Sequence, residues 1–276
     1  MSERALSVLV HGESKSGKST LANTAPAPRL IMDVEAAARF LPGKKIYWDP
    51  MDPKTPKPPK YDGTWETCVV VTDTYEVALK TYEWLKSGKH NFKSVILDSV
   101  SELQAKIQES VNERKALKIQ HWGELGTKLA FFCRDLRDLT ARPDSPIDAV
   151  VVTAMSKETQ EGHVRPFLSG QVATQLPYWF DVTSYLYVDH VEVEDEDGNV
   201  EEARERFLLV EPMNNIVAGN RVGGRLPDIV ESPNISDMIV EVFGPEDGDE
   251  EQYVDEEEEL DDDYEEEYTE EEPEEA

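Results

Sequence analysis

One short segment near the start of the sequence restricts the fold more than any other feature. Residues 12–19 read Gly-Glu-Ser-Lys-Ser-Gly-Lys-Ser and match the pattern G-x-x-x-x-G-K-[ST] at every fixed position. The glycines allow a tight turn in which successive backbone N–H groups converge, and such a concave row of donors binds phosphate. The pattern therefore predicts a phosphate-binding loop, or P-loop, inside an α/β domain.

The residues on both sides of the loop have the patterns that a P-loop needs. Ala5–His11 is apolar and rich in β-branched residues, which predicts a buried strand, and a helix should begin at Lys18 and end before Pro26. A glycine-rich turn that matched the pattern by chance would lack this strand–loop–helix order. The predicted ligand is ATP, and the predicted binding residues are Gly12, Glu13, Ser14, Lys15, Ser16, Gly17, Lys18, Ser19 and Thr20.

Magnesium is the expected companion of the bound phosphates. Lys18 should reach the β- and γ-phosphates, and the hydroxyl of Ser19 should coordinate Mg²⁺. An acid that supports the metal through water should end another strand, and Asp98 ends the apolar run Ser94–Asp98. Such an Asp can also simply cap the next helix, but in a chain with a P-loop we favour the magnesium role.

Hydrolysis of ATP also needs a carboxylate that orients or activates the attacking water. Glu35 and Glu76 are the two candidates, because each follows a predicted strand. Glu76 can equally be a solvated residue in the first turn of a helix. The residues alone leave the choice open.

The rest of the chain predicts strands that alternate with helices, which is typical of a mostly parallel sheet flanked by helices. An acidic segment around Asp197 indicates a hairpin, which adds antiparallel strands at the C-terminal side. Residues 42–64, rich in proline and lysine, predict an irregular exposed segment. The expected strands are Ala5–His11, Arg29–Val34, Thr67–Thr72, Ser94–Asp98, Ala149–Ala154, Phe180–Asp189 and Arg206–Glu211, and the expected helices after the P-loop helix are Tyr75–Ser87, Ser101–Leu117 and Gly126–Thr140.

The formal net charge of −30 is unevenly distributed along the chain. Most residues from Glu246 to Ala276 are Asp or Glu, and none is Lys or Arg. Such a segment cannot bury enough apolar surface to offset the entropy lost on ordering, so residues 245–276 should form a disordered tail after one domain of residues 1–244. The tail either keeps the protein soluble or mimics nucleic acid in a basic channel or a partner's groove.

Neither a membrane segment nor a disulfide is expected. No apolar run approaches the roughly 20 residues that cross a bilayer, and the start of the sequence has no signal-peptide pattern. Cys68 and Cys133 lie far apart and outside any Cys/His cluster, which predicts two reduced thiols. These features predict a soluble cytoplasmic protein without a membrane partner.

Several of these segments resemble, in order, the RecA-type ATPase core. Asp33–Ala37 resembles the Asp-Ala-Glu segment after the second strand of RecA, and Asp98–Leu103 resembles the segment that carries its magnesium acid. Tyr75–Leu79 resembles the Gly-Glu-Gln-Ala-Leu segment whose glutamate is the catalytic base. The resemblance therefore implies a RecA-like fold with Glu76 as the catalytic carboxylate, and Glu35 is the reserve choice.

The later part of the chain resembles more specialised relatives of that core. Gly219–Gly223 resembles the Lys-Asn-Arg-Phe-Gly motif of the RadA/Sms branch, which presents basic residues to the nucleotide of a neighbouring subunit. Because Gly219 replaces the lysine, only Arg221, or Arg221 together with Arg225, carries over. With the early P-loop and the pair Trp122-Gly123, the chain is similar to the phage-encoded Sak-type single-strand annealing proteins, an AAA-domain ATP-binding family.

This resemblance implies a function. It implies a magnesium-dependent ATPase that acts on single-stranded DNA in phage-type recombination or annealing, in the cytoplasm of a bacterial host. It also implies a homo-oligomer, as a ring or a filament, and a single-strand binding protein or another replication protein as a further partner. Residues 157–170 fall where RecA has a DNA-binding loop.

The residues themselves leave DNA binding open. Basic side chains interleaved with aromatic rings suit single strands, because cations track phosphates and rings stack on bases. The same lysines can also solubilise loops while the aromatic residues fill the core, and the acidic body lacks an overall basic footprint. The basic residues are Lys44, Lys45, Lys54, Lys57 and Lys60 near Tyr47, Trp48 and Tyr61; Arg114, Lys115, Lys118 and His121 near Trp122; and Lys157, His163 and Arg165.

Two other functions remain possible for such a chain. One is a P-loop kinase or GTPase unrelated to DNA, although no guanine-reading Asn-Lys-x-Asp motif occurs. The other is a nucleotide-gated annealing or adaptor module, in which hydrolysis is slow or incidental.

Overall fold

A computed structural model describes residues 4–112, 118–142, 145–194 and 200–245 of the chain. Met1–Gly244 forms one compact unit. Several sequence-based expectations lie outside the described residues: the acidic tail from Glu246 on, the turn around Asp197, and the basic residues Arg114 and Lys115.

Strands and helices alternate along the chain. The strands are β1 (Leu6–Gly12), β2 (Arg29–Asp33), β3 (Lys45–Tyr47), β4 (Thr67–Val71), β5 (Ser94–Asp98), β6 (Ala149–Glu158), β7 (Val164–Pro166), β8 (Val182–Glu194), β9 (Val200–Leu209), β10 (Gly219–Asn220) and β11 (Ile229–Glu231). The helices are α1 (Lys18–Ala22), α2 (Tyr75–Lys86), α3 (Val100–Asn112), α4 (Ile119–Arg137), α5 (Val172–Gln175) and α6 (Ile235–Phe243), with short 3₁₀ turns at Ala38–Phe40 and Leu176–Tyr178.

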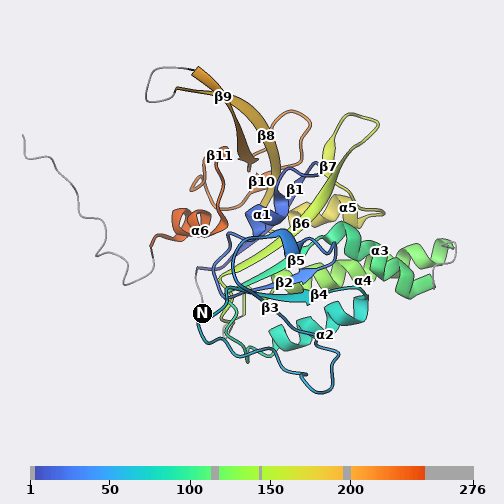
Figure 1. Cartoon of the computed structure of the whole chain (residues 1–276). Coiled ribbons are helices and arrows are strands. Elements are labelled where there is room, and N and C mark those ends of the chain that lie inside the picture. Colours follow the sequence, from blue (N-terminus) through green and yellow to red (C-terminus); the bar gives the residue numbers. More distant parts are fainter. Residues whose placement is uncertain (1–3, 113–117, 143–144, 195–199, 246–276) are drawn as a thin grey trace, which may run out of the picture. The chain divides into compact units, whose positions relative to one another are not determined.

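A mostly parallel sheet runs through this unit (Figure 1). Its strands pair in the order β11-β9-β8-β1-β6-β5-β2-β4-β3, and the strands from β8 to β3 are parallel. Antiparallel pairing adds β9 to β8, β11 to β9, β10 to β8 and β7 to β6. The predicted fold class, a mostly parallel sheet flanked by helices with antiparallel strands toward the C-terminal side, is confirmed.

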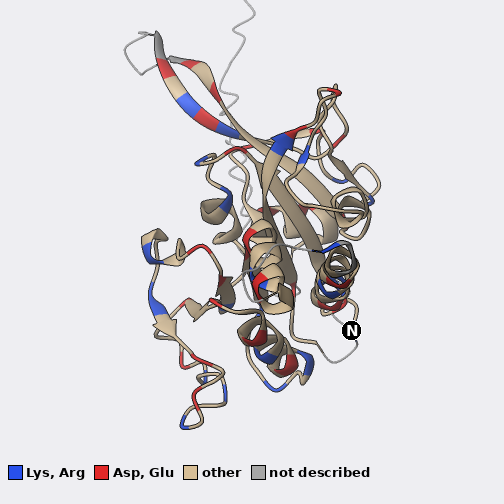
Figure 2. Cartoon of the chain, turned by 90° about the vertical axis from the view of Figure 1, so that its right-hand side faces the viewer, with Lys and Arg blue, Asp and Glu red and all other residues tan. Residues whose placement is uncertain are grey.

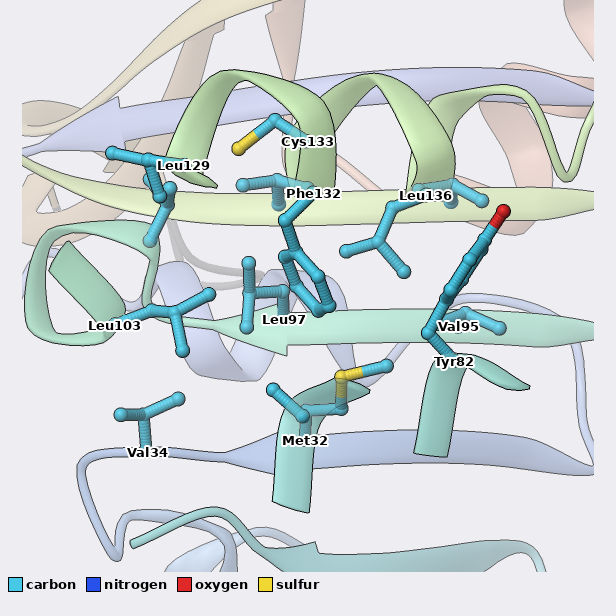
Figure 3. Packing of buried hydrophobic residues seen from close by; sticks show 14 of the residues in the cluster. Met32, Val34, Tyr82, Val95, Leu97, Leu103, Leu129, Phe132, Cys133 and Leu136 are labelled. Carbon is cyan, nitrogen blue, oxygen red and sulfur yellow. The ribbon is translucent and has the colours of Figure 1, made fainter. Parts of the chain in front are cut away.

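The central strands are buried on both faces, because helices cover both sides of the sheet. Every residue of β1 and β5 is buried, so these strands are nearly continuous apolar runs rather than alternating ones. One core cluster packs α2, α3 and α4 against one face, and Figure 3 shows Met32, Leu97 and Phe132 within it. The other cluster packs α1 and α6 against the opposite face. Successive residues of β1 alternate between the two clusters.

Two helices differ from the sequence-based expectation. The prediction that a helix begins at Gly126 is wrong, because α4 begins at Ile119 and contains both Gly123 and Gly126. Glycine disfavours a helix, but packing of α4 on α3 around the buried Leu125 outweighs that preference. Helix α6 is not anticipated. Its start is capped by Asn234, whose side chain accepts hydrogen bonds from two backbone N–H groups of the first turn.

Two segments predicted as irregular contain strands. Within residues 42–64, β3 pairs in parallel with β4, and Trp48 directly after it is only 5% exposed. The loop expected at residues 157–170 begins as a hairpin, because β6 continues to Glu158 and pairs with β7. In both cases a short polar strand forms at the edge of an existing sheet, which a local apolar pattern does not reveal. In the part of the chain that the structure describes, no helix is both long and apolar enough to span a bilayer.

Candidate nucleotide-binding site

The P-loop leaves the carboxyl end of β1 at Gly12 and enters α1 at Lys18. Both glycines of the motif are needed for local steric reasons. A side chain at Gly12 would collide with the backbone carbonyl of Leu186 in β8. Gly17 has φ +101°, a left-handed conformation that side chains rarely adopt. Glycine at these two positions therefore lets the loop pack closely against β8 and turn into α1.

The polar groups of the loop fit an anionic ligand. The Lys18 ammonium donates hydrogen bonds to the carbonyl oxygens of Gly12 and Glu13, at 3.0 and 2.6 Å. The hydroxyl of Ser16 is buried, and no hydrogen-bond partner for it is found in the described structure. A phosphate group in the cradle would satisfy such unused polar atoms, so the residues fit the nucleotide that the motif predicts. Ser19 is partly buried and Thr20 is exposed at the start of α1.

Two neighbouring strands bring acidic residues to this edge of the sheet. Asp33 ends β2 and pairs in register with Asp98, which ends β5. Asp98 is 3% exposed and accepts a hydrogen bond from the Thr153 hydroxyl in β6. Burial lowers the pKa of Lys18, while the charges of Glu35, Asp98 and Glu13 raise it. The charge of Asp98 therefore acts on the Lys18 ammonium.

Asp33 has a positioning role that the sequence analysis does not assign. Its carboxylate accepts hydrogen bonds from the backbone N–H groups of Ala37 and Ala38, at 2.9 and 3.2 Å. Burial raises the pKa of Asp33, and these backbone bonds oppose the shift. The bonds hold the turn after β2 that carries Glu35. An Asp at a strand end is a weak signal for this role, because many turns use the same bond.

The turn places the Glu35 carboxylate beside the other charged groups. The Ser99 hydroxyl donates a hydrogen bond to it. Desolvation raises the pKa of Glu35 most, the Ser99 bond lowers it, and the negative charge of Asp98 raises it further. The Glu35 residue as a whole is exposed to solvent. It is thus a carboxylate in contact with both solvent and the charged end of the site, a suitable place from which to orient water.

Glu76 lies away from Lys18 and Asp98. It is exposed in the first turn of α2, which follows β4. Because β4 is four strands from β1, its end lies roughly 19 Å from the P-loop strand, against roughly 14 Å for β2. Among the described groups whose charges affect Lys18, Glu35 is included and Glu76 is not. The structure brings Glu35 to Lys18 and Asp98, and does not bring Glu76 there.

Arg221 is also remote from the P-loop of its own chain. Its backbone N–H donates to Asp181, and its guanidinium donates to the Tyr178 carbonyl at 2.7 Å and lies 3.9 Å from the Asp181 carboxylate. Asp181 binds Ser7, which is five residues before Gly12, or roughly 16 Å along β1. The Arg221 guanidinium therefore lies too far away to contact phosphates bound by the P-loop of its own chain.

Arg206 on β9 is a residue near the loop that the sequence analysis does not assign. A Cβ built on Gly17 would lie 2.5 Å from Arg206 Nε. The two residues are far apart in the sequence and meet only because β9 pairs with β8 and β8 pairs with β1. The local sequence around Arg206, which alternates acidic and basic residues, contains no signal of this contact.

His11 connects the P-loop strand to two other segments. Its ring nitrogens bond the Ser156 hydroxyl in β6 at 2.7 Å and the Val217 carbonyl before β10 at 2.6 Å. Because a carbonyl only accepts, Nε2 carries the proton and Nδ1 accepts from Ser156. Burial lowers the pKa of His11 to about 4. His11, directly before Gly12, is thus a neutral, buried joint, which links β1 to β6 and to the segment that contains Val217.

A cavity of about 470 Å³ lies next to that joint, on the sheet face opposite α1. Its walls come from the β6–β7 hairpin, α5, the start of β8 and the segment with Val217 and Arg221. The side chains include exposed Tyr178 and both basic and acidic groups; the Nε of Arg165 is buried, and no partner for it is found in the described structure. Among the described residues, no cluster of three or more His, Cys, Asp or Glu could hold a metal ion.

Comparison with known proteins identifies the family of this chain. The sequence model of the AAA domain family matches residues 4–222, which is most of the chain. Among solved structures, the flagellar accessory protein FlaH from Methanocaldococcus jannaschii aligns at 10% identity over 83% of this chain and 87% of that chain, with a TM-score of 0.39. A similarity that low supports no functional argument. A search of curated protein sequences finds no match.

Proposed function

The chain belongs to the AAA domain family, and on that premise we propose that it is a magnesium-dependent ATPase that acts on single-stranded DNA as a homo-oligomer. The family and the P-loop make it a nucleotide-binding ATPase domain. Magnesium, DNA and the oligomer are extensions of that statement, and different side chains support each of them.

The chemical step is assigned to the acidic ends of β2 and β5. Lys18 leaves its two loop carbonyls and binds the β- and γ-phosphates. Ser19 and, through water, Asp98 would hold a magnesium ion, which would neutralise charge on the phosphates. Glu35 orients a water for attack on the γ-phosphorus, the bond from that phosphorus to the β–γ bridging oxygen breaks, and ADP and phosphate leave. Glu76 has no part in this step.

The cavity beside β8 is the observation that carries the DNA proposal. His163, Arg165 and Arg221 line it together with the ring of Tyr178, which is 79% exposed. Cations that bind phosphates beside a ring that stacks on a base are the typical equipment of a single-strand site. On the same hairpin, the Lys157 ammonium lies 5.2 Å from the centre of the half-exposed Phe167 ring.

His11 offers a route by which nucleotide and DNA affect each other. It precedes the P-loop directly, and its two hydrogen bonds hold the hairpin strand β6 and the Val217 segment at the cavity. A shift of the loop on phosphate binding would move this joint. The resemblance to Sak-type annealing proteins favours recombination or annealing as the process, in the cytoplasm of a bacterial host and beside a single-strand binding protein.

The test is ATP hydrolysis by the full chain with and without a single-stranded dT oligonucleotide, and with duplex DNA as control. We expect single strands to stimulate hydrolysis and duplex DNA to have little effect. Arg165→Ala with Tyr178→Ala should abolish the stimulation and keep the hydrolysis measured without DNA. Lys18→Ala should remove hydrolysis under both conditions, because the phosphates lose their loop cation.

Other outcomes would identify the alternatives. Hydrolysis that ignores both DNA forms would reject the DNA proposal and favour a P-loop enzyme with a small-molecule acceptor. Annealing of complementary strands that persists in Lys18→Ala and Glu35→Gln proteins would favour an annealing module in which hydrolysis is incidental.

A further inference from the structure

Arg206 stands at the level where the P-loop turns. Leu186 of β8 pairs with Gly12 on one side and with Leu208 of β9 on the other, so the three strands are aligned where β1 ends. Arg206 comes two residues before Leu208 in β9, opposite Val188, and so lies about 7 Å beyond the end of β1. That is the space into which the loop folds.

The side chain of Arg206 points to the correct face of the sheet. Leu208 belongs to the core cluster that packs α1, and residues two apart in a strand share a face. A Cβ built on Gly17 would lie 2.5 Å from Nε and 3.2 Å from Cζ of Arg206. The guanidinium therefore covers the glycine that precedes the phosphate-binding lysine.

The backbone of Arg206 is held on both sides. Its residue pairs with Val188 in β8, and its carbonyl accepts a hydrogen bond from Ser232, which directly follows β11. A side chain on a strand bonded to two neighbours is positioned more accurately than one on a loop. Arg206 is therefore a fixed part of the site rather than an accidental neighbour.

The guanidinium itself remains available for a ligand. Arg206 is exposed, and within the described part of the chain no carboxylate forms an ion pair with it. Arg221 differs, because Tyr178 and Asp181 of the same chain engage its guanidinium. An unpaired guanidinium beside an anion cradle presents two parallel N–H donors, which match the oxygens of a phosphate.

We propose that Arg206 is a phosphate-binding residue in cis: its guanidinium binds the phosphates of the nucleotide held by the P-loop of the same chain. Lys18 then approaches the phosphates from within the loop, and Arg206 approaches from the neighbouring strand. The proposal rests on nucleotide binding by the P-loop, and it is independent of DNA, of the oligomer and of the hydrolytic carboxylate.

Nucleotide affinity tests this proposal directly, using the full chain and fluorescent ATP and ADP analogues with magnesium. Arg206→Ala should raise the Kd for the triphosphate about tenfold, because a charge-assisted hydrogen bond is lost. Arg206→Lys should cause a smaller rise, since the charge stays and the paired donors go. Arg204→Ala is the matched control. Arg204 is exposed on the same face of β9, about 7 Å further from the loop, and its loss should leave the Kd unchanged.

Thermal unfolding with and without ATP separates a binding role from a structural one. If Arg206 binds phosphate, Arg206→Ala keeps the Tm of the free protein and reduces the upward shift caused by ATP. A lower Tm of the free protein with an unchanged Kd would make Arg206 a support of the loop and would overturn the proposal. An Arg206→Ala Kd within twofold of the parent value would do the same. A parent protein that binds no ATP would instead reject the nucleotide site as a whole.

Discussion

At the scale of single residues, Glu35 and Glu76 show that a sequence resemblance and the position in the fold can indicate different catalytic carboxylates. Both follow a strand, and the RecA resemblance selects Glu76. Glu35, however, accepts a hydrogen bond from Ser99 and interacts with the charges of Lys18 and Asp98, whereas Glu76 on α2 is not among the described groups whose charges affect Lys18. The difference arises because β2, and not β4, pairs with the strand that ends in Asp98.

We expect Glu35→Gln to lower the rate of ATP hydrolysis about 100-fold or more while nucleotide binding persists, because a carboxylate that orients water is lost and the phosphate contacts remain. Glu76→Gln is the matched control and should hydrolyse ATP at close to the parent rate. Single-turnover hydrolysis and equilibrium binding measure the two effects. The reverse result, a defect in Glu76→Gln alone, would return the role to the residue that the resemblance favours.

At the scale of elements, His11 joins three segments that are distant in sequence. It connects β1 to β6 through Ser156 and to the Val217 segment through a backbone carbonyl, and its ring packs 5.2 Å from that of Tyr185 in β8. Burial favours the neutral imidazole, in which Nδ1 accepts from the Ser156 hydroxyl and Nε2 donates to the Val217 carbonyl.

The stability of the fold should therefore depend on the protonation of His11. Its pKa is lowered from 6.5 to about 4 in the folded protein, so the unfolded chain binds more protons between these values, and stability is lost as pH falls through that range. The effect of this one group is about 3 kcal/mol at its limit. Urea unfolding at pH 7 and pH 5 measures it. His11→Gln should be less stable than the parent at pH 7, and the gap should narrow at pH 5; a constant gap would contradict the assignment.

At the scale of the whole molecule, Figure 2 shows acidic and basic residues interspersed along the β8–β9 hairpin. The two arginines of interest lie on different parts of the sheet: Arg206 is at the carboxyl end of β1, and Arg221 is at the level of Ser7 near its start. If Arg221 acts on ATP at all, the nucleotide must belong to another subunit.

Mixing inactive variants tests this arrangement. Lys18→Ala and Arg221→Ala proteins should each hydrolyse ATP poorly, and an equimolar mixture should recover part of the activity, because a Lys18→Ala subunit supplies Arg221 to a neighbour with an intact loop. The same mixture with Arg206→Ala in place of Arg221→Ala should hydrolyse ATP no faster than the sum of its two components measured separately at the same ATP concentration, since a cis residue cannot be supplied by a neighbour. If Arg221→Ala loses only the stimulation by DNA, its role lies in the cavity instead.

Several parts of the fold and of the site follow from local sequence. The P-loop, the strand Ser94–Asp98 and the order of strands and helices up to β6 all depend on residues that are neighbours in the chain, so apolar periodicity and glycine spacing reveal them. The edge strand β3 and the start of α4 do not, because pairing with β4 and packing on α3 outweigh weak or opposing local preferences.

The sequence by itself determined that this chain has a phosphate-binding loop and strand-end carboxylates in an α/β fold, because those features are encoded by consecutive residues. Only the tertiary structure decided which carboxylate lies where its charge acts on Lys18, that Arg206 covers Gly17 and that the Arg221 guanidinium binds Tyr178 instead of its own loop. Each of these contacts depends on the order in which strands pair. That order is set by packing between residues far apart in the chain, and no local pattern contains it.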